Sequence, residues 1–258
     1  MLKGIDVSVH QGTINWEKVK KHVDFAILRC GYGNNVDYQD DREFFQNVNG
    51  CIKNNIPFGI YLYSYAMSES EIESEIKHTL RLLQNIKPTL PVYIDVEERR
   101  QQNLGSKITD YVIRFCEEIK KNGFKPGVYA NKWWMTSILD YERIKDYSIW
   151  VAQYNAECTF NGNYDIWQFT SSGAIEGING NVDMNYLYNE SLLNITTPKK
   201  EEPEKESKSE NIIKYKVVKN DNLTKIAKMF NTTVEKIASD NNIVDPNLII
   251  TGQELIIK

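Results

Sequence analysis

The sequence is poor in the residues that most often bind transition metals. Among its 258 residues are only three histidines and four cysteines, and Cys30, Cys51, Cys116 and Cys158 form no CxxC pair or Cys/His cluster. Protein zinc sites draw on such clusters at short spacing. We therefore expect reduced, mostly buried thiols, no metal site and no other cofactor.

Positive charge is not in excess either, since 31 Lys and Arg residues stand against 35 Asp and Glu residues. Nucleic acid is therefore not an expected partner, because its binders usually carry a basic surface. No run approaches the roughly 18 apolar residues that cross a bilayer, so membrane insertion is not expected. The N-terminus, MLKGIDVSVH, enters a strand-like pattern at once and predicts no cleavable signal peptide.

One segment has no aliphatic or aromatic residue at all: "TTPKKEEPEKESKSE", residues 196–210, in which Lys and Glu alternate around two prolines. Such a stretch cannot bury enough surface to offset its ordering entropy, so it predicts an extended, solvated linker. We divide the chain into a large domain over 1–192, a charged linker over 193–213 and a small domain over 214–258.

The large domain alternates strand and helix patterns. Strands are expected at 4–9, 25–31, 57–66, 91–97, 125–131, 148–154, 164–169 and 182–187. Helices are expected at 14–23, 40–55, 69–86 and 107–122, with Ser68 and Ser106 as N-caps. This order predicts parallel strands joined by right-handed crossovers, and about eight strands in so short a chain favour a closed α/β barrel with shortened later helices. An open doubly wound sheet is the alternative.

Two acids stand at the end of one apolar strand, in the stretch "VYIDVEE" at 92–98. Because strand side chains alternate, Asp95 and Glu97 should project to the same side with Cβ atoms roughly 6 to 7 Å apart. Asp6 and Asp183 fall at or near other strand ends, where barrel enzymes place their chemistry. Crowded carboxylates raise one another's pKa, and we assign the proton to Glu97, which is nearer the strand end.

Other uses of these residues are open from the sequence alone. The acids could pair with Arg99 or Arg100 on the surface. They could bind a divalent cation, although no phosphate-binding glycine-rich loop accompanies them. A triad of Asp6, Ser8 and His10 is disfavoured, because residues two apart on one strand stand parallel and rarely converge.

Aromatic residues with polar tips gather near the expected strand ends, and such rings suit the faces of sugars. They are Tyr61, Tyr63, Tyr65, Trp133, Trp134, Trp150, Tyr154 and Trp167. About half of them, and Trp150 above all, are expected to be ordinary core residues.

Six blocks of sequence, in order, resemble the glycoside hydrolase family 25 lysozymes. They are "GIDVSVHQGTINW", "FAILRCGYG", "PFGIYLYSYA", "PVYIDVE", "WVAQY" and "IWQFTSSGAIEGINGNVDMNYL". The resemblance implies a TIM-like barrel of the reduced (β/α)5β3 kind that cleaves the β-1,4 bond between N-acetylmuramic acid and N-acetylglucosamine in peptidoglycan.

The resemblance also implies roles for individual residues. Glu97 resembles the general acid/base, and Asp95 resembles either the partner of the substrate's 2-acetamido group or a direct nucleophile. Asp6 and Asp183 would shape the floor of the pocket. Substrate-binding positions are expected at Tyr61, Tyr63, Trp133, Gln153 and Trp167.

The C-terminal segment, 215–258, resembles a LysM module in its strand, helix, helix, strand order. LysM modules bind N-acetylglucosamine-containing glycans, although a mere folding or dimerisation unit is the alternative. Asn222 stands where the family usually has Asp or Thr.

The expected partner is therefore the glycan strand of bacterial peptidoglycan, and a monomer is the default. The lack of a predicted signal peptide favours synthesis in the bacterial cytoplasm, and the resemblance implies action at the cell wall. Together they favour a phage endolysin over a bacterial autolysin. A silent glycan-binding barrel and a peptidoglycan amidase or peptidase are the rival functions.

Overall fold

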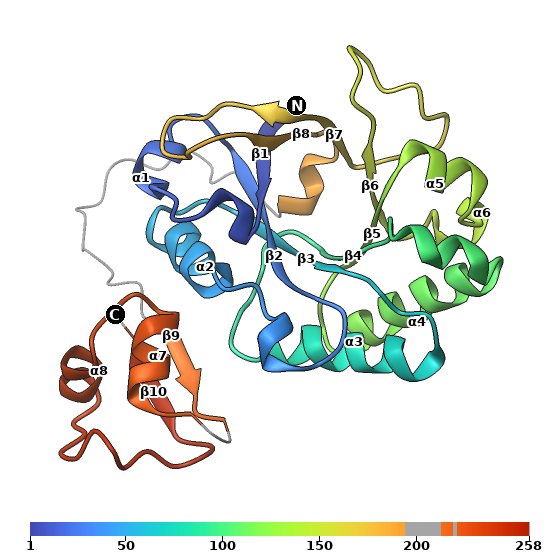
Figure 1. Ribbon diagram of the computed structural model, residues 1–258. Helices are drawn as coiled ribbons and strands as arrows, with labels where there is room; N and C mark the ends of the chain where they lie inside the picture. Colours follow the sequence, from blue (N-terminus) through green and yellow to red (C-terminus); the bar gives the residue numbers. More distant parts are fainter. Residues whose placement is uncertain (194–212, 219–220, 258) are drawn as a thin grey trace. The chain divides into compact units, whose positions relative to one another are not determined.

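The computed structural model describes residues 1–193, 213–218 and 221–257 (Figure 1). The predicted linker, 193–213, falls almost wholly outside the described residues. The chain forms two compact units, one built mainly from the N-terminal part and the other mainly from the C-terminal part.

Eight strands of the larger unit close into a barrel in sequence order (Figure 1). They are β1 (Leu2–Val7), β2 (Phe25–Tyr32), β3 (Phe58–Tyr63), β4 (Val92–Asp95), β5 (Pro126–Asn131), β6 (Ser148–Ala152), β7 (Ile166–Gly173) and β8 (Val182–Leu187). Strands β1 to β7 pair in parallel, as predicted. The barrel is thereby confirmed, and the open sheet is wrong.

The last strand departs from the all-parallel expectation, because β8 is antiparallel to both β7 and β1. Only residues 174–181 connect β7 to β8. A parallel crossover needs about a dozen residues or more, so a connection this short must return the chain in the opposite direction.

Helices cover the outside of the barrel, and the last two of them are short, as predicted. They are α1 (Trp16–Val19), α2 (Phe44–Lys53), α3 (Glu69–Leu82), α4 (Lys107–Lys121), α5 (Lys132–Ser137) and α6 (Tyr141–Ile144), with 3-10 turns η1 (Val9–Gln11), η2 (Asp37–Gln39), η3 (Arg99–Leu104) and η4 (Glu190–Leu193). Ser68 caps α3 by accepting a hydrogen bond from the Glu71 amide, as predicted. Ser106 precedes α4 but makes no such bond.

Aromatic rings fill the inside of the barrel. Trp150 is 1% exposed and packs against Tyr61, Tyr93 and Tyr129, with ring centroids 5.8, 5.4 and 4.4 Å away. Gly127 leaves the space that these rings need, because a Cβ there would lie 2.3 Å from the ring of Tyr93. The expectation that Trp150 belongs to the core is correct.

The smaller unit pairs β9 (Ile213–Lys216) with β10 (Glu254–Ile257) in antiparallel fashion, and α7 (Leu223–Met229) and α8 (Val234–Asp240) lie between them in sequence. This is the predicted βααβ order. Tyr215 and Phe230 pack edge to face in its core, 5.3 Å apart. Asn222 caps α7 by accepting from the Lys225 amide at 2.8 Å, so it performs the capping role that Asp or Thr would have.

Candidate active site

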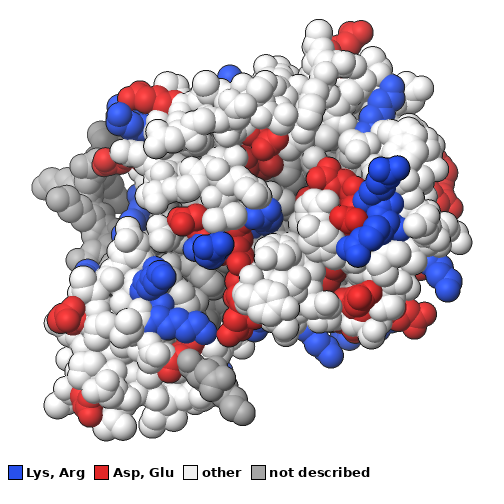
Figure 2. Space-filling model, viewed as in Figure 1, with Lys and Arg blue, Asp and Glu red and all other residues white. Residues whose placement is uncertain are grey.

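Four carboxylates from distant parts of the sequence meet at one end of the barrel. Asp6 lies near the end of β1, Asp95 ends β4, Glu97 follows it, and Asp183 is the second residue of β8. The negative charge of Asp183 raises the pKa of both Asp6 and Glu97, and Glu97 and Asp6 both raise the pKa of Asp95. On the face shown in Figure 2, acidic side chains lie in and around a hollow of the barrel, with basic ones interspersed.

The antiparallel last strand explains how Asp183 reaches this end of the barrel. Asp6 and Asp183 face each other directly in the pairing of β1 with β8. Because β8 runs the opposite way, its first residues meet the carboxyl end of β1. A parallel β8 would have carried a residue so early in the strand to the other end.

Asp6 is held by two amide side chains. Its Oδ2 atom accepts from Asn185 Nδ2 at 2.7 Å and from Gln168 Nε2 at 2.9 Å. Burial and then the charge of Asp183 raise the pKa of Asp6, the two amide donors lower it in part, and the result is a pKa of about 8. Asp6 is thus buried, fixed in place and able to hold a proton near neutral pH.

The orientation of both amides is fixed by a further layer of donors. Trp150 Nε1 donates to Asn185 Oδ1 at 2.8 Å, so the Asn185 nitrogen must face Asp6. The hydroxyls of Tyr129 and Tyr154 each donate to Gln168 Oε1 at 3.0 Å, with the same result for Gln168. The predicted catalytic and substrate-binding residues did not include Asn185, Gln168 or Tyr129; polar residues at period two in β7 and β8 were the available signal.

Asp95 has a different environment. The residue is only 3% exposed, and its Oδ1 atom is buried without a hydrogen-bond partner among the described residues. Burial, followed by the charges of Glu97 and Asp6, raises its pKa well above the ordinary carboxyl value, while the cation of Arg29 opposes the rise. An orphaned acceptor of this kind is ready for a donor that the chain itself does not provide.

Glu97 is less deeply buried than Asp95. Burial and then the charge of Asp183 raise its pKa above the ordinary value. The raised pKa expected for one acid of the pair is therefore found at both. Asp95 is the more buried of the two, and Glu97 is the acid that a ligand can reach.

A partly buried cation, Arg29, lies near these acids and was not predicted from the sequence. Arg29 Nε donates to Asp41 Oδ2 at 2.8 Å. Asp41 is fixed in turn by the backbone amides of Val9 and Glu43, each 2.9 Å away. The signal was present: Arg29 is the one charged residue of the apolar strand β2, "FAILRCGY".

Two of the five expected substrate-binding residues lie beside the acids. Tyr61 is influenced by the charges of Asp6 and Asp95, and Tyr63 by those of Glu97 and Asp95, while burial is the main reason that the pKa of each hydroxyl is raised. These two tyrosines therefore remain in the proposed site.

The other three are placed differently. Trp167 precedes Gln168 on β7, so its ring lies on the opposite face and packs against Phe169 and Tyr186. Gln153 uses both ends of its amide on Thr159, at 2.9 and 2.8 Å, and so closes the 153–159 loop. Trp133, on α5, is 51% exposed and packs edge to face against Trp134. These contacts favour structural roles for Trp167 and Gln153, and substrate binding by any of the three residues stays a prediction.

The competing uses of the acids find no support. Arg100 Nε donates to Glu98 Oε1 at 3.0 Å instead of to Asp95 or Glu97. Ser8 follows β1 and caps η1, so no triad forms with Asp6 and His10. Within the described ranges, no group of three or more His, Cys, Asp or Glu side chains has an arrangement that could hold a metal ion.

Two further sequence expectations concern cysteines and membranes. Cys30, Cys51 and Cys116 are free and buried, and Cys158 is free and partly exposed, as predicted. Among the residues that the structure describes, no helix is both long and apolar enough to pass through a bilayer.

Comparisons with known proteins agree with this architecture. The model of the glycosyl hydrolases family 25 matches residues 5–178, and the LysM domain model matches residues 215–258. The modular autolysin LytC from Streptococcus pneumoniae, solved with a synthetic peptidoglycan ligand, is similar over 71% of this chain at 30% identity and a TM-score of 0.64. This chain covers 46% of that protein.

Two other relatives are similar over comparable lengths. The catalytic domain of endolysin ply40 from bacteriophage P40 of Listeria monocytogenes is 27% identical with a TM-score of 0.66, and the match covers 75% of this chain and 96% of that one. Lysozyme M1 of Streptomyces globisporus is 26% identical over 202 residues, which cover 71% of this chain and 67% of the relative.

Proposed function

This chain belongs to the glycosyl hydrolases family 25 and is a lysozyme-type glycoside hydrolase with a LysM domain, and we propose that it cleaves the β-1,4 bond between N-acetylmuramic acid and N-acetylglucosamine. The observation that carries the proposal is the acid pair at the end of β4. Partly exposed Glu97, with a raised pKa, lies beside buried Asp95, whose Oδ1 atom has no partner in the described structure.

Glu97 acts as the general acid in this mechanism. Cleavage requires a proton on the glycosidic oxygen as the bond to the anomeric carbon breaks, and a carboxyl group with a raised pKa keeps that proton to a higher pH than an ordinary one does. After the leaving sugar departs, the same group as a carboxylate takes a proton from the attacking water. Of the four acids, Glu97 combines partial exposure with proximity to Asp95 and Asp183.

Asp95 orients the 2-acetamido group of the muramic acid. Its unpartnered Oδ1 atom can accept the acetamido N–H, which turns the acetamido oxygen toward the anomeric carbon for attack. Substrate assistance of this kind is a known alternative to a protein nucleophile. The unpartnered Oδ1 atom is the observation that favours this role over direct attack on the anomeric carbon.

The LysM domain supports action at the bacterial cell wall. Tethering a glycan-binding domain to the barrel replaces a second encounter by an intramolecular one. We propose that the protein is a phage endolysin, and a bacterial autolysin is the alternative. Each class has a member among the relatives, since ply40 is a bacteriophage endolysin and LytC is an autolysin.

Replacement of the acid tests the proposal. Glu97→Gln should lower the release of reducing ends from purified walls at least a thousandfold, the upper range for loss of general acid/base catalysis. The variant should still sediment with the walls. Glu98→Gln is the matched control, because Glu98 neighbours Glu97 but pairs with Arg100, and it should retain the wild-type rate. Undiminished release by Glu97→Gln would refute the assignment.

Deletion of 211–258 tests the role of the LysM domain. The shortened chain should adsorb less to walls and retain the wild-type rate on soluble glycan fragments. Unchanged adsorption would assign wall binding to the barrel, contrary to the proposal. Loss of activity on the soluble fragments would show that the barrel does not act without the LysM domain, which also contradicts the proposal.

A further inference from the structure

A second hollow of the barrel opens beside the acids. It has a volume of about 560 Å³, and its lining includes Arg29, Tyr32, Tyr38, Arg42, Tyr63 and Tyr65. Tyr63 connects the hollow to the acid pair, because its hydroxyl is influenced by the charges of both Glu97 and Asp95. A substrate bound at the acids therefore has this hollow as its neighbour.

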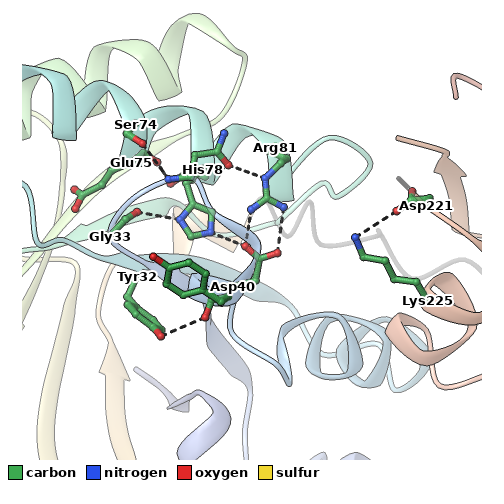
Figure 3. Close-up of polar contacts among 12 residues, drawn as sticks. Tyr32, Gly33, Asp40, Ser74, Glu75, His78, Arg81, Asp221 and Lys225 are labelled. Carbon is green, nitrogen blue, oxygen red and sulfur yellow. Dashed lines mark hydrogen bonds and ion pairs between the residues drawn. The ribbon is translucent and has the colours of Figure 1, made fainter. Parts of the chain in front are cut away.

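One wall of the hollow, the segment 33–41, is held unusually firmly (Figure 3). His78 of α3 is fully buried, and its two ring nitrogens lie 3.0 Å from the Gly33 carbonyl oxygen and 2.8 Å from Asp40 Oδ1. Arg81, one turn further along α3, binds both carboxylate oxygens of Asp40 and donates to Asn35 Oδ1 at 2.7 Å. Both partners of His78 are acceptors, so an N–H on either ring nitrogen has an acceptor on this segment.

These contacts also settle the charge of the hollow. The carboxylate of Asp40 is neutralised by Arg81, and that of Asp41 by Arg29. Arg42 is exposed, and in the part of the chain that the structure describes its guanidinium has no ion-pair or hydrogen-bond partner. The hollow therefore presents one guanidinium, that of Arg42, whose charge no carboxylate of the described residues neutralises. Its planar set of N–H donors suits a carboxylate ligand.

Tyrosine rings line the same hollow. Tyr38, on the segment 33–41, is 80% exposed, and its backbone carbonyl accepts from the Tyr32 hydroxyl at 3.3 Å. Tyr65 lies between Tyr32 and Tyr63, with ring centroids 6.1 and 4.9 Å away. These tyrosine rings offer flat apolar surfaces for packing, and the neighbouring Arg42 offers a site for one anion.

We propose that this hollow binds the acidic stem peptide that the muramic acid at the cleavage point carries, with Arg42 on a peptide carboxylate and Tyr38 against the peptide chain. The inference rests on the proposed function. The peptide leaves the same sugar that Glu97 and Asp95 act on, and two to four extended residues reach roughly 7 to 14 Å, enough to cross the hollow from Tyr63. A bare glycan would leave the cation of Arg42 unused.

Three forms of one substrate test this assignment on the full chain. They are soluble uncrosslinked glycan strands with native stem peptides, the same strands with the peptide carboxylates converted to amides, and strands stripped of their peptides. We expect the wild type to have a kcat/KM on native strands roughly tenfold above that on amidated strands, the loss typical of one charge-assisted hydrogen bond.

Arg42→Gln should lower kcat/KM on native strands to the amidated level and leave the other two substrates unchanged. Lys120→Gln, an equal change of charge on an exposed residue of α4, should have no such effect. Tyr38→Ala should slow both peptide-bearing forms, whereas Tyr38→Phe should not. Because Tyr38 and Arg42 are exposed, neither change threatens folding.

Several results would overturn the stem-peptide site. One is an equal rate of the wild type on native and amidated strands. Another is an equal effect of Arg42→Gln on all three forms, and a third is an effect on stripped strands, whose lactyl carboxylate would then be the ligand. These results differ from failure of the proposed function, in which no strand would yield reducing muramic acid.

Discussion

The two sides of the acid cluster are built in opposite ways. On the β1, β7 and β8 side, Asp6 receives two amide donors whose own orientation is fixed by Trp150, Tyr129 and Tyr154. On the β4 side, Asp95 is just as deeply buried, yet one of its oxygens has no partner among the described residues. The first side is complete in the free protein, and the second becomes complete only with a ligand.

This difference separates residues that stabilise the barrel from residues that act on the substrate. A buried polar atom without a partner costs free energy, about 1–3 kcal/mol, and such costs are typical of functional sites. Replacements on the β4 side should therefore harm activity and help stability. Replacements on the β1, β7 and β8 side should lower the stability of the fold before they affect activity.

Asp95→Asn should give the largest effect. The amide keeps the shape of the side chain but presents a donor or a weaker acceptor to the acetamido N–H, so release of reducing ends should fall roughly a hundredfold to a thousandfold, as for loss of one preorganised polar contact to the reacting group. Asp110→Asn, on the exposed face of α4, is the control for an acid-to-amide change. An ordinary rate for Asp95→Asn would remove Asp95 from the mechanism.

The same variant should be more stable than the wild type, in a pH-dependent way. The pKa of Asp95 is raised in the folded state, so the folded protein holds this proton more firmly than the unfolded chain does. Wild-type stability should therefore fall as the pH rises from the ordinary carboxyl pKa, near 4, up to the raised one.

Asparagine does not titrate, so the advantage of Asp95→Asn should be smallest at about pH 4 and grow toward neutral pH. Urea unfolding at several pH values measures this difference directly. An advantage that is constant over the range would mean that Asp95 is not protonated by burial.

Asn185→Leu addresses the opposite side. It removes a donor to Asp6 and leaves the Trp150 indole N–H without its acceptor. The free energy of unfolding should fall by roughly 1–3 kcal/mol, the cost of an unsatisfied buried group. Asn122→Leu, at the exposed end of α4, serves as the control. If Asn185→Leu unfolded at the same urea concentration as the wild type, this hydrogen-bond network would not be stabilising.

The smallest effect is expected for Gln153→Ala. Both ends of this side chain bind Thr159, so the change should loosen the 153–159 loop and alter kcat/KM by no more than about twofold. A loss approaching that of Asp95→Asn would restore Gln153 to the substrate-binding set.

The sequence allowed the barrel and the acid pair to be predicted for a clear physical reason. Alternation along an apolar strand places Asp95 and Glu97 on one side, and repeated strand and helix patterns require parallel neighbours. The direction of β8 was not predicted, because it depends on the length of the connection from β7 rather than on the strand pattern. Its consequence, the direct pairing of Asp6 with Asp183, was therefore found only in three dimensions.

Side-chain direction accounts for what the sequence did not reveal about the site. Trp167 and Gln168 are adjacent on β7, and the sequence favoured the aromatic residue although the barrel turns Gln168 inward. The partners of His78 could not be found from its helix alone, because Gly33 and Asp40 lie about 40 residues earlier and come to it through the packing of β2 against α3. Contacts between distant segments carry no local pattern.

Mass spectrometry of a purified-wall digest tests the central claim most directly. If Glu97 and Asp95 cleave the glycan as proposed, the products should be disaccharide peptides that end in reducing N-acetylmuramic acid, and Glu97→Gln should produce none. Freed peptides with intact glycan strands, or products that end in reducing N-acetylglucosamine, would contradict the account.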